Sequence, residues 1–150
     1  IEDILKLPKD KMIIALSEHL DERTGYGDNL SPLNQWERNI YDVITLSDEV
    51  NSGGFDFYLT HYCQRFYQVR KALLAMGAVS MVQLLDDVQE KFPTQKIPSS
   101  MRQIEDVLEE MTMRGIDFEK EGLDLYVDGD FLNLMEKLYL YIETNRKKLR

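Results

Sequence analysis

Residues 49–58 read EVNSGGFDFY, and this stretch decides more of the fold than any other. It sets two adjacent glycines inside strongly helical sequence and follows them with aromatic residues. Glycine adopts backbone angles with φ > 0 at little cost, so it suits the position directly after a helix. We therefore expect a helix to end at Gly53-Gly54 and Phe55 to fold back onto its last turn. A phosphate-binding loop is disfavoured, because the strand before such a loop and the Lys and Ser/Thr after it are absent.

Upstream of the glycines, apolar residues recur at helical spacing in two segments. The first follows Pro8 and is broken by Gly25 and Gly27. The second runs through residues 33–50, and the pair Ser31-Pro32 predicts its start, since Ser is a good cap and Pro fits the first helical turn. One face of this second helix is apolar, and we expect its other face to carry most of the polar residues, namely Asn34, Glu37, Arg38 and Asp42.

Downstream of the glycines, the pattern predicts further helices over residues 55–59, 66–76 and 79–92. Another begins after Ser100, where the Ser-x-x-Gln spacing is typical of a capping box, and a last one runs from Asp130 to the end. Residues 115–128 are the least regular, and 123–127 alternate between apolar and polar, which also suits an extended segment. The predicted fold is an all-α, single-domain multi-helix bundle over residues 1–150.

Composition favours an ordered, intracellular protein. The hydrophobic share of 43% and the charged share of 30% are near globular averages. A single cysteine, Cys63, cannot form an intramolecular disulfide, and no apolar run approaches the roughly 20 residues that span a bilayer. We expect a cytoplasmic protein that does not enter a membrane, although a start at Ile1 leaves a preceding segment open.

The net charge of -9 is unevenly distributed. Residues 102–145 hold 12 acids against 4 bases, whereas residues 146–150 hold 4 bases. Such a field repels nucleic acid phosphates and attracts basic proteins, so direct nucleic acid binding is disfavoured. The predicted acidic interaction face comprises Glu105, Asp106, Glu109, Glu110, Asp117, Glu119, Glu121, Asp124, Asp128 and Asp130. The simpler interpretation of the same residues is a solvated helix surface.

The glycine turn also resembles a known family. The matching residues are Glu49, Val50, Asn51, Gly53, Gly54, Phe55 and Tyr58. They resemble the turn of a bacterial domain-of-unknown-function family whose namesake is an acidic DNA-mimic protein. The similarity runs from about Leu33 to the final helix, while Ser52 stands where the family often has a second Asn. The resemblance implies an all-helical fold with no enzymatic activity general to the family.

No residue set predicts a catalytic, metal or cofactor site. His61 and Cys63 are two positions apart, so on a helix they point in different directions, and a buried thiol is the better interpretation of Cys63. The acids around Asp124 and Asp128 resemble a calcium loop only partly, because Tyr126 and Met135 occupy ligand positions.

Three functions are therefore weighed. The leading one is a non-enzymatic acidic protein, DNA-mimic-like, that binds a basic partner of the kind that binds nucleic acid. The second is a small-molecule binder or enzyme with a pocket near Gly53-Gly54 and the aromatic residues that follow. The third is a structural module that forms a homodimer, which the apolar last helix favours.

The predicted turn leads to a first test. If the ring of Phe55 is buried, Phe55→Ala should lower the free energy of unfolding by about 3 to 5 kcal/mol. Chemical denaturation measures this, and a loss below about 1 kcal/mol would show that the ring is exposed.

Overall fold

The computed structural model describes residues 1–127 and 130–150, and the side chains of residues 1–125 and 133–150. All regular structure in this part of the chain is helical, which confirms the all-α class. The α-helices are α1 Lys9–Thr24, α2 Gln35–Tyr62, α3 Phe66–Ala75, α4 Val79–Glu90, α5 Met101–Met113, α6 Glu119–Val127 and α7 Asp130–Thr144. Short 3-10 helices cover Ile4–Lys6, Cys63–Arg65 and Arg146–Lys148.

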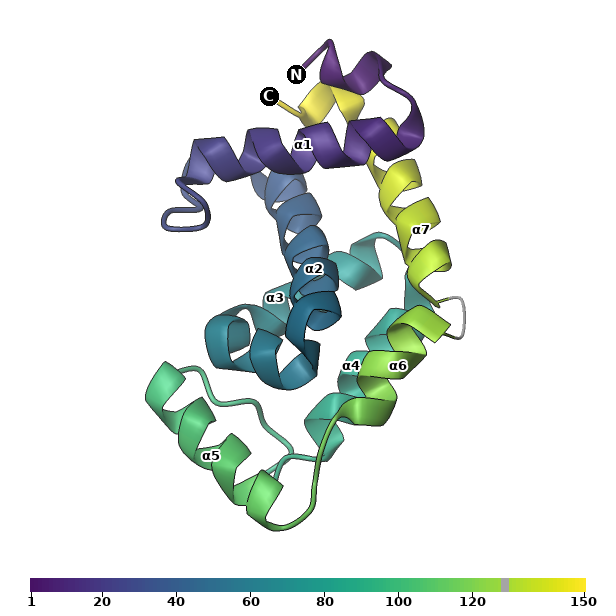
Figure 1. Cartoon of the computed structure of the whole chain (residues 1–150). Helices are drawn as coiled ribbons and strands as arrows, with labels where there is room; N and C mark the ends of the chain where they lie inside the picture. Colours follow the sequence, from purple (N-terminus) through teal and green to yellow (C-terminus); the bar gives the residue numbers. More distant parts are fainter. Residues whose placement is uncertain (128–129) are drawn as a thin grey trace.

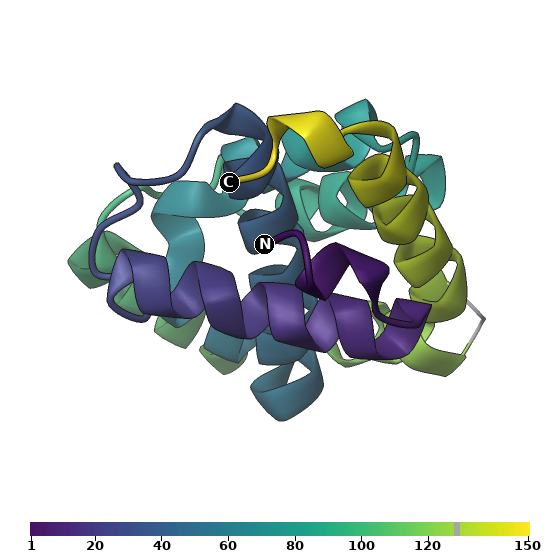
Figure 2. The ribbon, with the colours of Figure 1, turned by 90° about the horizontal axis from the view of Figure 1, so that it is seen from above.

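Helix α2 is the central element of the bundle (Figure 1). It contacts α1, α3, α5, α6 and α7. Helix α1 crosses one end of the molecule, and α5 lies at the other end in the same view. Both chain ends lie on the side of α1 (Figure 2), where Arg146 Nη2 donates to the carbonyl oxygen of Leu5 at 2.5 Å.

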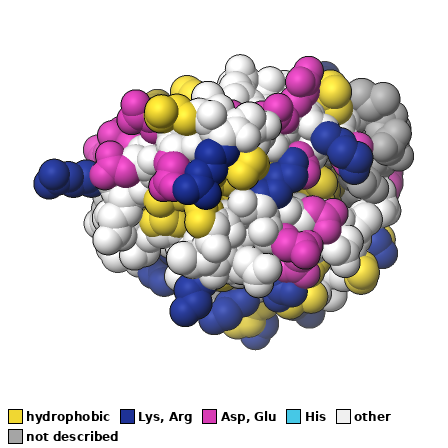
Figure 3. Space-filling view, turned by 90° about the horizontal axis from the view of Figure 1, so that it is seen from below, with side chains coloured by type: hydrophobic (Ala, Val, Ile, Leu, Met, Phe, Trp, Pro, Cys, Tyr) yellow, Lys and Arg dark blue, Asp and Glu magenta, His cyan; other side chains and the backbone are white. Residues whose placement is uncertain are grey.

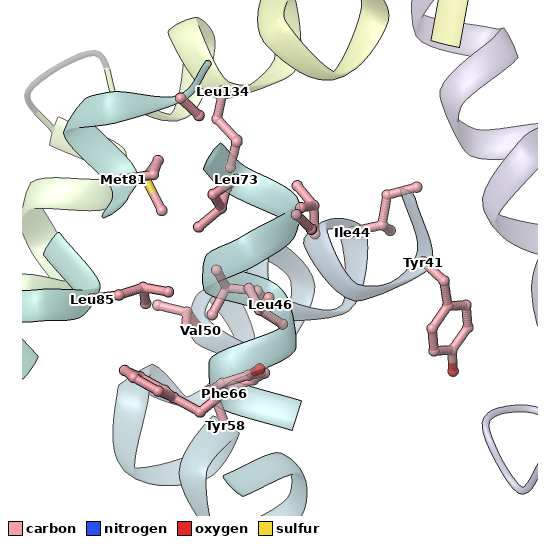
Figure 4. Close-up of a cluster of buried hydrophobic side chains, with 14 of the residues drawn as sticks. Tyr41, Ile44, Leu46, Val50, Tyr58, Phe66, Leu73, Met81, Leu85 and Leu134 are labelled. Atoms are coloured by element: carbon pink, nitrogen blue, oxygen red, sulfur yellow. The ribbon is translucent and has the colours of Figure 1, made fainter. Parts of the chain in front are cut away.

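The core lies where α2, α3, α4 and α7 meet. Leu46 and Val50 of α2 face Leu73 of α3 and Leu85 of α4 (Figure 4). Phe55 belongs to the same buried cluster, and only 1% of it is exposed, which confirms the expected burial of its ring. Burying each such side chain contributes roughly 1.5 to 3 kcal/mol, so the kink that turns Phe55 inward is tied to the core.

The glycine pair divides α2 into two helical stretches that meet at a kink, so the helix before the glycines ends there as predicted. Gly54 has φ 75° and ψ -176°, a conformation almost restricted to glycine, while helical geometry continues on both sides as far as Tyr62. The expected positive φ is thus present at Gly54. A Cβ on Gly53 would lie 2.6 Å from Cβ of Phe57, so the first glycine is needed for close approach.

The start of α2 differs from the prediction. Asn34 is the N-cap: its side-chain oxygen accepts from the backbone N–H of Glu37 at 3.1 Å. Glu37 Oε2 in turn accepts from the backbone N–H of Asn34 at 2.9 Å. This reciprocal pair satisfies two free backbone donors, and the pair Ser31-Pro32 lies in the preceding turn.

Two acids expected among the polar residues of α2 are buried instead. Glu37 is 0% exposed and receives Arg23 Nη1 at 2.8 Å and the backbone N–H of Arg150 at 2.7 Å. Asp42 is also buried and binds Arg65 through two hydrogen bonds, of 3.0 and 2.6 Å. Buried carboxylates require such partners, which here come from other elements.

Two local predictions in the second half have opposite outcomes. Ser100 caps α5, since its hydroxyl oxygen accepts from the backbone N–H of Gln103 at 3.1 Å. The extended alternative for residues 123–127 is wrong, because they belong to α6. Leu125 is fully buried there, so tertiary packing outweighs the local alternation.

Gly54→Ala should lower the free energy of unfolding by about 1 to 3 kcal/mol, because alanine is strained in this conformation although no atom lies within 4 Å of the new Cβ. Gly122→Ala is the matched control. Gly122 lies in α6 with equally open space and without positive φ, so alanine should stabilise by about 0.5 to 1 kcal/mol. Equal effects in chemical denaturation would contradict the assigned kink.

Glu37→Ala should cost about 3 to 5 kcal/mol, because it leaves the mostly buried Arg23 without its carboxylate. The control is Glu110→Ala, which removes an exposed ion pair with Arg114 and should cost below about 1 kcal/mol. Thermal and urea unfolding of both variants measure the contrast, and a loss at Glu37 as small as the control's would disprove the anchoring role.

Candidate functional site

Helix α5 presents the first group of predicted acids to solvent. Glu105, Asp106, Glu109 and Glu110 are all exposed, while Ile104, Leu108 and Met111 on the opposite side are buried. Glu110 forms an ion pair with Arg114 at 2.7 Å. The other three carboxylates have no ion pair within the described residues, so their charge is available to a partner.

The remaining predicted acids do not form one surface. Asp117 and Glu119 are exposed, but Glu121 is buried and binds Lys91 at 2.6 Å. Asp124 is partly buried and receives Lys120 at 3.1 Å. Asp128 lies outside the described residues, and the side chain of Asp130 lies outside them as well.

Figure 3 shows the α5 end of the molecule in space-filling form. Acidic side chains lie there in separate groups, with Lys, Arg and apolar side chains between them. The exposed negative charge is therefore local, and the sequence-wide excess of acids does not produce a continuous acidic face at this end.

Some of the turn residues lie in the core and others lie at the protein surface. Val50, Phe55 and Tyr58 are buried, whereas Asn51 is exposed and Glu49 is partly exposed. Tyr58 stacks on Tyr62 with ring centroids 5.7 Å apart. Among the aromatic residues at and after the turn, Phe55 packs in the core, whereas Tyr58 and Tyr62 also line a cavity.

The first of these cavities is a small acidic cleft between α1 and α2, with a volume of about 120 Å³. Its charged wall residues are Asp21, Asp48 and Glu49, and its rings are those of Tyr26, Tyr41 and Tyr62. No Lys, Arg or His lines this cavity. None of the three carboxylates forms an ion pair with a described residue, so the cleft carries negative charge with no cation of its own.

The second cavity adjoins the first, since Tyr26, Tyr41, Thr45 and Tyr62 line both. Its volume is about 370 Å³. Asp42 and Arg65 lie in its wall as a bonded pair. Tyr58 lines it too and is only 1% exposed, yet its hydroxyl has no hydrogen-bond partner among the described residues.

Burial and mutual repulsion raise several pKa values around these cavities. Burial raises the pKa of Asp21, and burial together with the charge of Asp21 raises the pKa of Asp48. Burial, followed by the charge of Glu49, raises the pKa of Tyr62. Burial also raises the pKa of Asp42 although Arg65 opposes the shift. A bound cation would favour the ionised form of each carboxylate.

The pocket weighed near the glycine turn did not include the α1 wall of this cleft, because the two walls come from separate segments. Tyr26 is the one local signal: it lies between Gly25 and Gly27, has φ 58° and is 78% exposed. A bulky residue with positive φ is uncommon. Tyr41 points away from the aliphatic core (Figure 4), and a Cβ on Gly27 would lie 2.8 Å from its hydroxyl oxygen.

Other candidate sites are less developed. Cys63 is buried, as expected, and burial raises the pKa of its thiol. His61 Nδ1 lies 2.8 Å from the carbonyl oxygen of Phe57. Among the described residues, no group of three or more His, Cys, Asp or Glu could hold a metal ion, and no helix has the length and apolarity to cross a bilayer.

Comparison with known families bears on the region from the start of α2 to the end of α7. The model of the DMP19-like protein family matches residues 31–145. The chain belongs to the DMP19-like family. This confirms the resemblance drawn from the glycine turn, which lies inside the matched region. Neither the curated proteins nor the solved structures contain a match.

Proposed function

We propose that this member of the DMP19-like family is a non-enzymatic, DNA-mimic-like protein that binds a basic, nucleic-acid-binding protein. The observation that carries the proposal is the row of exposed, unpaired carboxylates on α5, formed by Glu105, Asp106 and Glu109, in a family whose namesake is a DNA mimic. The basic partner is proposed from chemistry, since closely spaced carboxylates attract the surfaces that phosphates attract.

Helix geometry gives this row a charge spacing near that of a nucleic acid. Residues 105–109 span about 6 Å at roughly 1.5 Å per residue. The three unpaired carboxylates in that length lie on average about 3 Å apart along the axis, compared with one charge per about 3.4 Å along one strand of DNA. The local density is therefore similar over a short distance, which suits a contact of a few phosphates.

The two alternatives differ in how much support they have. A pocket near the glycine turn has specific support, because Glu49 and Tyr58 line adjoining cavities. The dimer module has less, since its motive was the apolar last helix. In the described part of α7, the apolar residues Leu134, Leu138 and Ile142 are buried in the chain's own core.

The test neutralises the α5 row without changing its shape. The variant E105Q/D106N/E109Q should bind the partner at least about tenfold more weakly, since three rim charges of about 0.5 kcal/mol each sum to roughly that factor. The immobilised chain is incubated with extract of its source cell, and the bound proteins are identified and quantified between about 50 and 200 mM salt. Competing duplex DNA should displace them.

The matched control is E2Q/E18Q/E90Q, which removes the same charge from three exposed acids that have no ion pair among the described residues. It should retain binding, because these acids are distributed over other surfaces. If both variants lose partner binding equally, the loss comes from the change in net charge and not from the α5 row. Recovery of acidic or neutral proteins that DNA does not displace would disprove the proposal.

A further inference from the structure

We propose that the larger of the two adjoining cavities binds a nucleoside, an uncharged planar base with its sugar and without phosphate. This cavity has a volume of about 370 Å³, and its walls come from the loop over residues 26–30, from α2 on both sides of the kink, and from the 3-10 helix that follows α2. The inference goes beyond partner binding, because it gives the protein a small ligand at a surface separate from α5.

A buried hydrogen-bond donor without a partner belongs to this cavity. Tyr58 lines it yet is only 1% exposed, and its hydroxyl makes no hydrogen bond with any described residue. Burial raises the pKa of Tyr58, and next the charge of Asp42 raises it while that of Arg65 lowers it. Both of these residues line the same cavity. The hydroxyl therefore stays protonated, lies near this pair and can donate to the acceptor of a ligand.

Arg65 adds donors at the same place. Its Nε and Nη2 donate to the two carboxylate oxygens of Asp42 at 3.0 and 2.6 Å, and Asp42 is only 4% exposed. A guanidinium has five N–H groups, so this pairing leaves others for a ligand while the carboxylate balances the charge. Donors without net positive charge suit a neutral acceptor, such as the carbonyl oxygen or ring nitrogen of a base.

The rings and the size of the cavity favour a planar ligand. Tyr26, Tyr41 and Tyr62 line it as well, and Tyr26 is 78% exposed, so its ring is open to a stacking partner. Nucleobases stack on aromatic side chains largely irrespective of their identity. Cavities for drug-sized ligands measure about 300 to 1,000 Å³, and a volume near the lower limit suits a nucleoside.

The surrounding charge disfavours a phosphate. Asp28 lines the cavity, and the adjoining cleft is lined by three more carboxylates, those of Asp21, Asp48 and Glu49. No described Lys lines either cavity, and the guanidinium of Arg65 is already paired. A phosphate would therefore be repelled by these acids, whereas an uncharged nucleoside would not.

The test titrates the whole chain with adenosine, guanosine, cytidine and uridine by calorimetry. At least one should bind with a dissociation constant in the micromolar range. Its 5′-monophosphate should bind several-fold more weakly because of the acids, and ribose alone should not bind. If none of the four nucleosides binds, or if ribose binds equally well, the proposal is overturned. A monophosphate that binds more tightly than its nucleoside would contradict the assigned ligand class.

Two variants locate the ligand in the cavity. Y58F removes only the hydroxyl and should weaken binding about fivefold or more, while the free protein melts at the same or a higher temperature because an unsatisfied buried group is gone. Y26N removes the exposed ring, and asparagine tolerates the positive φ there; it should have a similar effect on binding.

The matched control is Y139F, which makes the same change on α7, where Tyr139 lines neither cavity. It should leave binding within about twofold. If Y58F keeps the affinity of the unaltered protein and melts at a lower temperature, the hydroxyl is held by water inside the cavity and the proposed site is wrong.

The α5 variant separates this inference from the proposed function. E105Q/D106N/E109Q should bind the nucleoside unchanged, and Y58F should still capture the basic partner. Ring resonances of Tyr26 and Tyr62 should shift in nuclear magnetic resonance spectra as the nucleoside is added. Shifts confined to α5 would overturn the cavity and leave the proposal for α5 standing, whereas unchanged partner capture by the α5 variant would count against that proposal alone.

Discussion

The buried carboxylate of Glu37 is the constraint on which the arrangement of α1 and α2 depends. A charge removed from water must be compensated by partners in fixed geometry. Burial alone would raise the pKa of Glu37, but hydrogen bonds from Arg23, Asn34 and Arg150 outweigh it and hold that pKa below its ordinary value. The carboxylate therefore stays ionised and ties together the end of α1, the start of α2 and the last residues of the chain.

The acidic cleft inherits its shape from this anchor. One wall comes from the last turns of α1 and the loop that holds Tyr26, and the other from α2 between Tyr41 and Glu49. Arg23 lies two residues after Asp21, so its bonds to Glu37 also fix the position of that carboxylate relative to α2. The kink at Gly54 acts from the other end, because it directs Tyr58 back toward the second cavity.

Local features were predictable from the sequence because their causes are local. Helical periodicity, the positive φ at Gly54 and the Ser100 cap each depend on neighbouring residues. The burial of Glu37 was not predictable from the sequence, because its partner Arg23 is 14 positions away and no spacing rule joins the two residues. At the start of α2, the cap predicted at Ser31 was wrong, because the reciprocal bonds between Asn34 and Glu37 place the cap at Asn34.

The acids of the candidate site also divide into those whose exposure follows from local sequence and those whose environment depends on distant residues. The exposure of the α5 acids follows from the apolar stripe of their own helix, whereas the burial of Glu121 depends on Lys91 of a distant segment. The total of 27 acids consequently overstates the carboxylates available for recognition, since several of them are already paired with a base within the fold. For a protein that competes with nucleic acid, the relevant quantity is the set of carboxylates without an internal partner. On the described surface, the α5 row of Glu105, Asp106 and Glu109 meets that condition.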